Sequence, residues 1–537
     1  MSYDFDPLYH PYPSRRSVVF SQKGMVATSQ PLAAQAGLEA IKKGGNAVDA
    51  AVSAAACLTV TEPTSNGIGG DAFALVWTGG HLYALNASGP APKMISAEAV
   101  KEMGYSQMPN LGWLPVTVPG APAGWAELSK NWGKMSLKEV FAPAIEYARF
   151  GFPVSPVTAQ LWGRAVQKYK EGRGEEFQEW FNTFAPEGSA PRAGQVINFP
   201  AHASTLLSIA ESEGSSFYRG EIAEKIDSFS RQYGGFLRGE DLQNYRPRWV
   251  EPVGTEYRGF RIWETPPNSQ GLVALMALNI IKELQLHGRG DEESLHLQIE
   301  AIKLAFADGF KYVTDPEKMT RSVEELLSES HTRMRSSLVN QCAASPARSH
   351  NPGGGTVYLA TADGEGNMVS YIQSNYEGFG SGLVVPGTGI ALQNRGKEFS
   401  LDQNHSNYLE PGKKTYHTII PGFLTRGDQP VGAFGVMGGY MQPQGHLQMV
   451  INMVRRGLNP QAALDAPRWK WVNDKTVELD PSFPLPLARS LAGRGHNISY
   501  SYDLSGFGRG QIILRNPQNG VLCGATEPRA DGAVAAW

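Results

Sequence analysis

The amino-terminal part of the chain carries hydrophobic patterns typical first of helices and then of a strand. Residues 31–45 (PLAAQAGLEAIKKGG) space their apolar side chains three and four positions apart and end in two glycines, which predicts a helix that stops there. Asn46 is a typical helix-capping residue. The almost entirely small or apolar residues 47–63 after it predict a second helix, buried on most sides. A glycine-rich loop then enters an apolar strand, GIGGDAFALVW. A dinucleotide site needs the order strand, loop, helix, so this loop does not indicate one.

The rest of the pattern divides the chain into a helix-rich and a strand-rich part. Residues 135–345 are predicted to be mainly helical, and residues 356–537 to form mainly strands, with one helix near 444–456. Residues 342–355 are rich in Ala, Ser, Pro and Gly and are the best candidate boundary. Helices followed by strands indicate an α+β protein of stacked layers.

A β-hairpin is predicted for residues 357–372 (VYLATADGEGNMVSYI), where two strand-forming runs flank a turn-forming cluster. A turn centred on Glu365 places Thr356 opposite Ser374. Three glycines come directly before Thr356 and leave two interpretations open. Either they form a turn before an ordinary strand, or the chain cuts itself between Gly355 and Thr356 and uses the new amino terminus.

Composition excludes several classes of protein. Of the 537 residues, 41% are hydrophobic and 18% charged, which fits a well-packed globule. The net charge of −3 gives no reason to expect nucleic acid or an anionic membrane as a partner, and no apolar run is long enough to span a membrane. Cys57, Cys342 and Cys523 have neither metal-ligand spacing nor a disulfide pattern, and the first twenty residues lack an apolar signal segment. We therefore expect a cytoplasmic protein without a metal site.

Several separate motifs resemble the γ-glutamyltransferase family and occur in its order along nearly the whole chain. They are KKGGNAVDAAVSAAACLTVTEPTSNGIGGDAF, TVYLATADGEGNMVS, FGSG at 379–382, EFS at 398–400 and MGG at 437–439. The resemblance implies the four-layer αββα fold of the N-terminal nucleophile hydrolases. It also implies self-cleavage before Thr356 into a large subunit, 1–355, and a small subunit, 356–537, which together form one αββα body.

The resemblance further implies a threonine nucleophile. Mature Thr356 would supply the attacking hydroxyl and, as base, a free α-amino group with a pKa of about 8. The N–H groups of Gly438 and Gly439 match the family's oxyanion donors, and Ser374 matches the threonine that supports the nucleophile. No cofactor is implied, and a homodimer of the processed heterodimer is compatible with the family.

The substrate pocket departs from the family pattern. Ser88 stands where the family has the arginine that grips the α-carboxylate of γ-glutamyl substrates, and serine cannot replace that fork. Glu398 keeps an acidic group for the substrate amino group. The other altered pocket positions are Arg395, Tyr376, His417 and Thr418. The segment from EFS to YHT is shorter than in many members, so we expect no lid loop and an open pocket.

These departures favour a small amide-acid as substrate. Arg395 and His417 are candidates to hold its carboxylate, the alternatives being a structural ion pair and an ordinary core histidine. YHTIIP, LQNRG and SNYEGFGSG look most like a branch with oxamate amidohydrolases and cephalosporin acylases. We expect an autoprocessed threonine amidohydrolase acting on an oxamate-like substrate. A glutathione hydrolase or γ-glutamyl transferase, a glutaryl (cephalosporin) acylase and an unprocessed binding protein are the alternatives.

Overall fold

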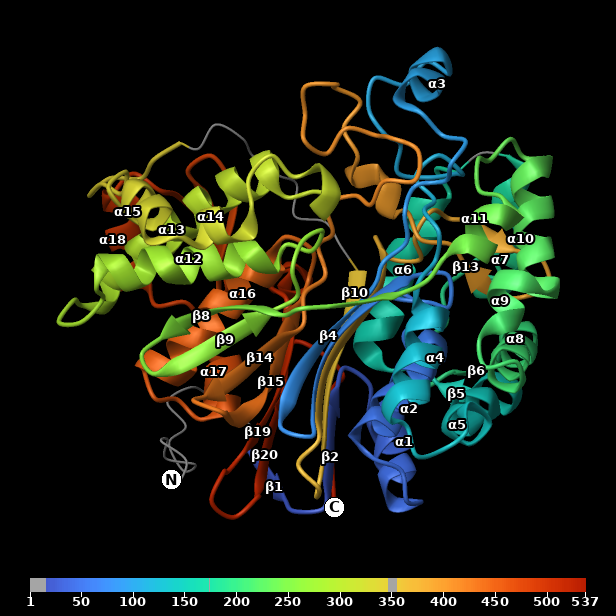
Figure 1. The fold of residues 1–537 in the computed structure, drawn as a ribbon, viewed down its shortest axis with the longest axis horizontal. Coiled ribbons are helices and arrows are strands. Elements are labelled where there is room, and N and C mark those ends of the chain that lie inside the picture. The colour runs from blue at the N-terminus through green and yellow to red at the C-terminus, as the bar shows by residue number, and fades with distance from the viewer. Residues whose placement is uncertain (1–15, 173, 346–354) are drawn as a thin grey trace.

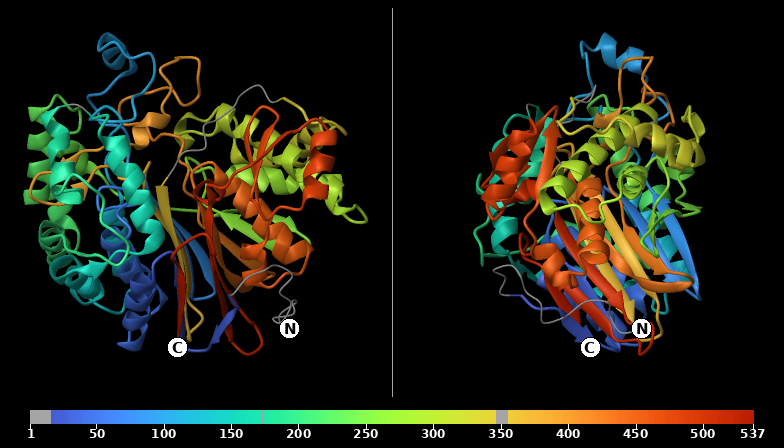
Figure 2. Two further views of the ribbon diagram at one scale, coloured as in Figure 1. Left: turned by 180° about the vertical axis from the view of Figure 1, so that it is seen from behind. Right: turned by 90° about the vertical axis from the view of Figure 1, so that its left-hand side faces the viewer.

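Two β-sheets face each other and helices cover their outer surfaces, so the molecule has four layers (Figures 1 and 2). The computed structural model describes residues 16–172, 174–345 and 355–537. Each sheet contains seven strands, and all their pairings are antiparallel. The predicted α+β class and its αββα layering are confirmed.

Both sheets draw strands from either side of the Gly355–Thr356 bond. The first sheet, in spatial order, is β21 (Ala533–Ala536), β2 (Gly24–Thr28), β10 (Gly355–Asp363), β11 (Met368–Tyr376), β3 (Asp71–Thr78), β4 (His81–Ala87) and β7 (Arg248–Val250). The second is β1 (Val19–Ser21), β20 (Leu522–Thr526), β19 (Arg509–Arg515), β15 (Gln429–Met437), β14 (Gly422–Arg426), β9 (Phe260–Glu264) and β8 (Val253–Tyr257). The division of the chain at residue 355 therefore does not divide the fold.

One helical layer covers the first sheet, on the right in Figure 1. It contains α1 (Pro31–Lys42), α2 (Ala47–Thr61), α4 (Ala121–Trp132), α5 (Leu137–Phe150), α6 (Pro156–Tyr169), α7 (Gln178–Phe184), α8 (Pro200–Glu211), α9 (Ser215–Arg219), α10 (Glu221–Gln232) and α11 (Gly239–Asn244). As predicted, α2 begins after Asn46, whose side chain accepts hydrogen bonds from the N–H groups of Val48 and Asp49. Every residue of α2 is buried, because its small side chains let it pack between the sheet and the other helices.

The other helical layer covers the second sheet, on the left in Figure 1. It contains α12 (Gly271–Leu284), α13 (Asp291–Tyr312), α14 (Val323–Leu327), α15 (Glu329–Ser336), α16 (Met441–Val450), α17 (Pro460–Asp465) and α18 (Leu485–Gly493). Short strands lie beside these layers: β5 (Phe152–Pro153) with β6 (Val196–Ile197), β12 (Val384–Val385) with β13 (Ile390–Ala391), and β16 (Trp469–Asn473) with β17 (Thr476–Leu479) and β18 (Asn497–Tyr500).

Apolar cores join the layers. Phe73, Tyr358, Ile372 and Phe423 are among the buried side chains that pack between the two sheets. Larger cores lie between each sheet and its helices. Along β10 and β11, alternate residues therefore face the space between the sheets and the helical layer. Thr356 is on the same side of β10 as Tyr358, which places it between the sheets.

The predicted hairpin forms with the predicted register. Val357 pairs with Gln373 and Ala360 with Ser370, as a turn centred on Glu365 requires. The pairing shifts between Gly355 and Val357, where a β-bulge lies. The bulge places Thr356 beside Ser374 at the very start of β10.

Two segments differ from the sequence-based expectation. The region expected to be mainly helical includes β7, β8 and β9, which lie at or next to the sheet edges and are only partly buried. The helix expected at 444–456 is α16 followed by a π-helical turn, Ile451–Arg455. Most of the candidate boundary, residues 346–354, lies outside the described residues.

All three cysteines are free thiols, and Cys57 and Cys523 are buried. Among the described residues, none of the helices has the length and apolar character needed to cross a membrane. The cytoplasmic location stays a prediction.

Candidate functional site

A chain of hydrogen bonds links Thr356 to the peptide bond before it. The hydroxyl of Thr356 donates to Ser374 Oγ over 3.2 Å, and the hydroxyl of Ser374 donates to the carbonyl of Gly355 over 2.6 Å. Ser374 Oγ also accepts the N–H of Tyr376 at 2.8 Å. Both hydroxyl residues are buried. The Gly355 carbonyl therefore has a donor already in place, and the Thr356 proton has an acceptor.

Gly355 is required for a close approach of two chain segments. A Cβ on Gly355 would lie 2.8 Å from the backbone nitrogen of Gly378 and 3.3 Å from Cα of Ser65. Both contacts involve backbone atoms, which cannot rotate away as a side chain can. A side chain at position 355 would therefore push the start of β10 away from the backbone at Gly378 and Ser65.

Gly438 and Gly439 form the turn between β15 and α16. Their φ angles of +138° and +58° are unfavourable for other residues. Their carbonyls accept hydrogen bonds from Met441 and Gln442, and Gln270 donates to the Gly439 carbonyl at 2.9 Å. Within the described part of the chain, neither glycine N–H donates to a backbone carbonyl outside the regular elements.

The glycine turn and Thr356 lie at the same end of the sandwich. The Ser370 hydroxyl, on β11 opposite Ala360, donates to the Phe434 carbonyl at 3.4 Å, and further along β10 the ring of Tyr358 packs on Gly435. β10 and β15 therefore lie across from each other in the two sheets. Thr356 at the start of β10 and Gly438 after the end of β15 are at the same end of these strands. The glycine turn therefore lies at the Thr356 end of the sandwich, and the role of its N–H groups as oxyanion donors stays a prediction.

Arg395 is a fully buried cation without a counter-ion at contact distance. It lies in a short 3-10 helix, Arg395–Glu398, donates through one terminal nitrogen to Thr418 Oγ1 at 2.7 Å, and stacks 4.1 Å from the centre of the Tyr376 ring. Its Nε and other terminal nitrogen have no hydrogen-bond partner in the described chain. No carboxylate of the described residues comes within 4.0 Å of it, so the predicted alternative of a structural ion pair is wrong. Burial lowers the pKa of this guanidinium.

Glu398 accepts hydrogen bonds from two tyrosine hydroxyls, those of Tyr376 and Tyr440. Through Tyr376 this carboxylate is connected to Ser374. Burial and the Glu398 charge raise the pKa values of both tyrosines, so their hydroxyls stay protonated as donors. Glu398 therefore fixes the ring on which Arg395 stacks.

The open pocket stays a prediction, because the described residues at this site differ in exposure. Thr356, Arg395, His417 and Thr418 are buried, while Glu398 and Gly438 are partly exposed. Phe399, Leu401 and Leu409 pack against residues 91–108, which include α3 (Ala97–Glu102), at the top of Figure 1. The short segment after Glu398 is therefore held down by an apolar cluster of its own.

His417 pairs with Asp71, a residue that the sequence-based reasoning did not select. Nε2 of His417 lies 3.0 Å from Asp71 Oδ2, while Asp71 Oδ1 accepts the N–H groups of Gly89 and Gly120 and the amide of Gln393. Burial raises the pKa of Asp71 to about 7 and holds that of His417 well below its usual value. The available signal was an aspartate directly before an apolar strand. His417 is thus neutral and rigidly held, nearer to the core-histidine alternative than to a direct substrate ligand.

Ser88 lies at the far side of this polar cluster. Its hydroxyl donates to Asn86 Oδ1 at 2.7 Å and lies 3.4 Å from Asn268 Oδ1. Asn268 in turn accepts the N–H of His417 through its carbonyl. The predicted pocket positions therefore belong to one buried network, with Thr356 and Arg395 at one side and Ser88 at the other.

Buried neutral histidines make the fold sensitive to acid. Burial lowers the pKa of His202 to about 4 and that of His417 further. Between pH 4 and the unfolded pKa of about 6.5, the unfolded chain binds more protons at these positions, so stability falls as pH falls through this window. We expect His202 alone to contribute up to about 1.4 kcal/mol per pH unit to the free energy of unfolding.

Urea unfolding of the uncut chain, obtained with Thr356→Ala, at pH 7, 6 and 5 measures this slope, with His202→Gln in the same background as the comparison. The variant should have a smaller slope, because glutamine does not titrate but can still bond to Thr59 and Gly389, as His202 does. Identical slopes in the two proteins would contradict the assignment to His202.

A second polar cluster could offer ligands to a metal, but most of its ligand atoms are already paired, with Nδ1 of His496 the exception among the described residues. His296, His496 and Glu300 place their ligand atoms within 4.8 Å of one another. His296 bonds the Asn340 carbonyl at 2.7 Å and His496 at 2.9 Å, while the ammonium of Lys303 donates to Glu300 at 2.8 Å. A cation would have to displace that ammonium, so the cluster does not fit a metal ion well.

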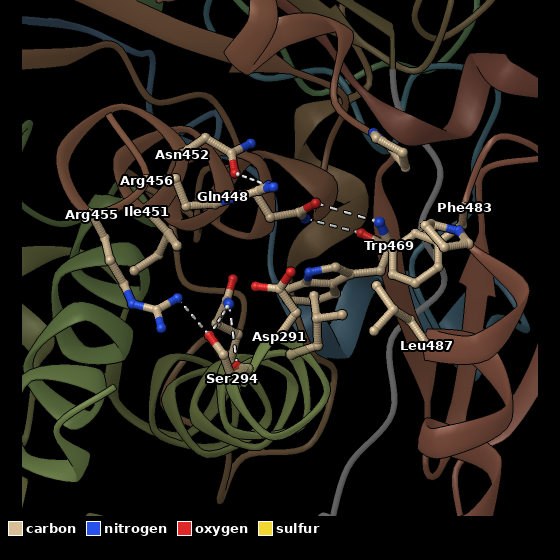
Figure 3. Close-up of a pocket in the computed structure, with 14 residues that line it drawn as sticks. Asp291, Ser294, Gln448, Ile451, Asn452, Arg455, Arg456, Trp469, Phe483 and Leu487 are labelled. Atoms are coloured by element: carbon tan, nitrogen blue, oxygen red, sulfur yellow. Dashed lines mark hydrogen bonds between the residues drawn. The ribbon is translucent and has the colours of Figure 1, made fainter. Parts of the chain in front are cut away.

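A cavity of about 160 Å³ lies apart from Thr356, between α13, the π-helical turn, β16 and α18. Its polar groups mostly bind one another (Figure 3). Arg455 donates to Ser294, and Gln448 bonds Trp469. None of the residues of the Thr356 site lines it.

Facing sheets between helical layers, with a buried threonine at the start of a central strand, define the N-terminal nucleophile hydrolase class of fold. The sequence profile of the gamma-glutamyltranspeptidase family matches residues 33–537. The chain therefore belongs to the gamma-glutamyltranspeptidase family, and the predicted resemblance is confirmed.

Individual relatives cover nearly the whole chain. The glutathione hydrolase-like YwrD proenzyme of Bacillus subtilis is 34% identical over 529 residues, which are 96% of this chain and 99% of the relative. The oxamate amidohydrolase proenzyme of Klebsiella pneumoniae is 34% identical over 530 residues, with the same coverage. The crystal structure of a cephalosporin acylase from Bacillus halodurans is 60% identical and superimposes with a TM-score of 0.95 over 99% of both chains.

Proposed function

We propose that this protein is a self-processing threonine amidohydrolase that hydrolyses the amide bond of a small, oxamate-like amide-acid. The hydrogen-bonded series Thr356–Ser374–Gly355 carbonyl carries the proposal, because it joins a nucleophile, a proton acceptor and a polarised carbonyl at one peptide bond. The similarity to proenzymes that act as hydrolases supports it.

Self-cleavage would begin with the attack of Thr356 Oγ1 on the Gly355 carbonyl carbon. The new C–O bond forms as the hydroxyl proton moves to Ser374 Oγ and Ser374 passes its own proton to the carbonyl oxygen, which gives a neutral tetrahedral intermediate. That proton returns through Ser374 to the nitrogen as the carbonyl re-forms and the C–N bond breaks. Water hydrolyses the resulting ester, which frees the Gly355 carboxylate, the Thr356 hydroxyl and the Thr356 α-amino group.

Turnover would repeat this chemistry on an external amide. The α-amino group of Thr356 accepts the hydroxyl proton, and the hydroxyl attacks the substrate amide. The amine or ammonia leaves, and water attacks the acyl-enzyme. The N–H groups of Gly438 and Gly439 are the proposed oxyanion donors when the hydroxyl attacks the amide and when water attacks the acyl-enzyme.

Arg395 supports a substrate that carries a carboxylate close to its amide. The charges of Asp71 and Glu398 favour the Arg395 cation, but neither carboxylate contacts it, and two of its buried nitrogens lack partners in the described chain. A carboxylate would satisfy both nitrogens in a fork geometry. Because Arg395 stacks on Tyr376, whose N–H bonds Ser374, this anchor is near the nucleophile.

Arg395→Met tests the proposal through opposite changes in activity and stability. We expect KM for oxamate to rise at least about 10-fold, because the carboxylate loses a charge-assisted contact. The free energy of unfolding should rise by about 1–3 kcal/mol, because a buried charge without a counter-ion is removed. Ammonia release by the processed protein measures the first effect, and urea unfolding of the uncut chain, obtained with Thr356→Ala, measures the second.

Arg395→Lys is the matched control, since it keeps the charge but not the fork. It should recover part of the affinity and none of the stability. A methionine variant that is less stable and binds oxamate unchanged would show that Arg395 is structural.

An acylase that removes the side chain of a cephalosporin is the second candidate. The 60% identity to the Bacillus halodurans structure over the whole chain favours it. A substrate panel separates the two: oxamate turnover without release of a glutaryl group supports the amidohydrolase, and the reverse supports the acylase. A γ-glutamyl substrate is less well supported, because Ser88 offers no cation.

A further inference from the structure

A second cation approaches the polar cluster from its far side, opposite Arg395. Lys414 follows the segment that packs on α3, and its Nζ lies 3.3 Å from Asn86 Oδ1. The same oxygen accepts the hydroxyl of Ser88 at 2.7 Å. The ammonium group therefore belongs to the network of Ser88, although it comes from a distant part of the chain.

The charge of Lys414 is not neutralised by a direct ion pair. No carboxylate of the described residues lies within 4.0 Å of its Nζ, and its three protons share one protein acceptor, Asn86. The charged groups around it are Asp71 on β3, Arg248 on β7, and Asp315 and Glu317 beside the Pro316–Lys318 turn. The carboxylate of Asp315 accepts a hydrogen bond from the backbone N–H of Lys414. Burial lowers the pKa of this ammonium to about 8, so it is charged at neutral pH.

Arg395 and Lys414 both act on the Asp71–His417 pair. Arg395 bonds Thr418, next to His417, and Lys414 is joined to the backbone of His417 through Asn86 and Asn268. The charge of each cation lowers the pKa of Asp71 and of His417. The two cations are connected to this pair differently. Arg395 contacts Tyr376 and Thr418, on the side of Ser374, whereas Lys414 contacts Asn86, on the side of Ser88. Two anchors for negative charge thus lie on two sides of one neutral, rigid pair.

We propose that Lys414 is a specificity-determining residue whose ammonium group binds the distal carboxylate of longer amide-acids, such as succinamate and glutaramate, while Arg395 binds that of short ones. The inference rests on the proposed amidohydrolase activity and specifies its substrate class as monoamides of dicarboxylic acids. Lys414 thereby places a cation near Ser88, the position at which the family pattern has an arginine. An ammonium on a flexible stem suits acids of several lengths better than a guanidinium fork would.

Ammonia release from oxamate, malonamate, succinamate and glutaramate tests the proposal with wild type, Lys414→Met and Lys414→Arg. At pH 7 the methionine variant should raise KM for the two longest acids about 10- to 100-fold and change KM for oxamate less than about twofold. The kcat values should change little, because a contact to the distal carboxylate binds ground and transition states alike. Lys414→Arg keeps the charge but not the flexible ammonium, so its KM values for the longer acids should lie between those of wild type and Lys414→Met. Oxamate turnover shows in each sample that the site is intact.

A pH profile adds a readout that a purely structural role would not affect. For wild type, KM for glutaramate should rise above pH 8 as the ammonium loses its proton, and this rise should be absent in Lys414→Met. Lys318→Met, an exposed lysine paired with Glu410, is the control for general loss of positive charge.

The outcomes separate the two proposals. If wild type hydrolyses none of the four acids, the proposed amidohydrolase activity fails. If wild type hydrolyses them and Lys414→Met alters all four equally or none, the activity stands and the role of Lys414 is refuted. Dependence on Lys414 that increases with chain length supports it.

Discussion

Thr356→Ala is expected to leave the chain in one piece and to abolish amide hydrolysis. The variant lacks the hydroxyl that forms the new bond to the Gly355 carbonyl carbon, and without cleavage it also lacks the α-amino base. By analogy with nucleophile deletions in other hydrolases, activity should fall by at least about 10⁴-fold. Intact mass spectrometry of freshly purified protein should find fragments 1–355 and 356–537 in wild type only.

Thr356→Ser is the matched control, because it keeps a hydroxyl on the same backbone. It should cleave, more slowly than wild type, and retain measurable turnover. A single intact chain in wild type as well as in both variants would rule out self-cleavage and restore the interpretation of the glycines as an ordinary turn.

Ser374→Ala is expected to slow self-cleavage by about 10²- to 10³-fold. The substitution removes the 2.6 Å hydrogen bond to the Gly355 carbonyl and the acceptor of the Thr356 proton at the same time. Electrophoresis of samples taken after synthesis would follow the decay of the uncut chain. The fold should persist, because alanine is smaller and β11 keeps its backbone pairing.

Ser374→Thr keeps the hydroxyl and should cleave much faster than the alanine variant. Cleavage of Ser374→Ala at the wild-type rate would contradict the proposed role of Ser374. In that case the donor to the Gly355 carbonyl would have to be another group.

The hairpin shows what local sequence can predict. Its turn residues and alternating pattern determine the register, so the local sequence predicts Thr356 beside Ser374, as the structure has it. The helices α1 and α2 can likewise be predicted from the sequence, because Gly44 and Asn46 mark the end of one and the start of the next. These features depend on residues close together in the chain.

The rest of the site depends on segments that meet only in the fold. Nothing near Asp71 in sequence indicates that His417 is its partner, and nothing near Lys414 indicates Asn86. The sequence also does not show that Arg395 is buried with no carboxylate in contact, because its neighbours come from distant parts of the chain. The shortened segment after Glu398 packs on α3, a contact between distant parts of the chain that the sequence does not reveal.

Each sheet combines strands from before and after the proposed cut, and this affects whether the protein can refold once it is cleaved. In the first sheet β10 lies between β2 and β11, so a strand from beyond the proposed cut is hydrogen-bonded to one from before it. While the chain is continuous, these strands meet as parts of one molecule, and folding does not depend on concentration. After cleavage the same pairing would have to form between two separate chains, which dilution opposes. The uncut chain should therefore refold after denaturation, and the processed protein should not. Each molecule has to fold before it is cleaved, because its two chains do not find the same fold again after unfolding.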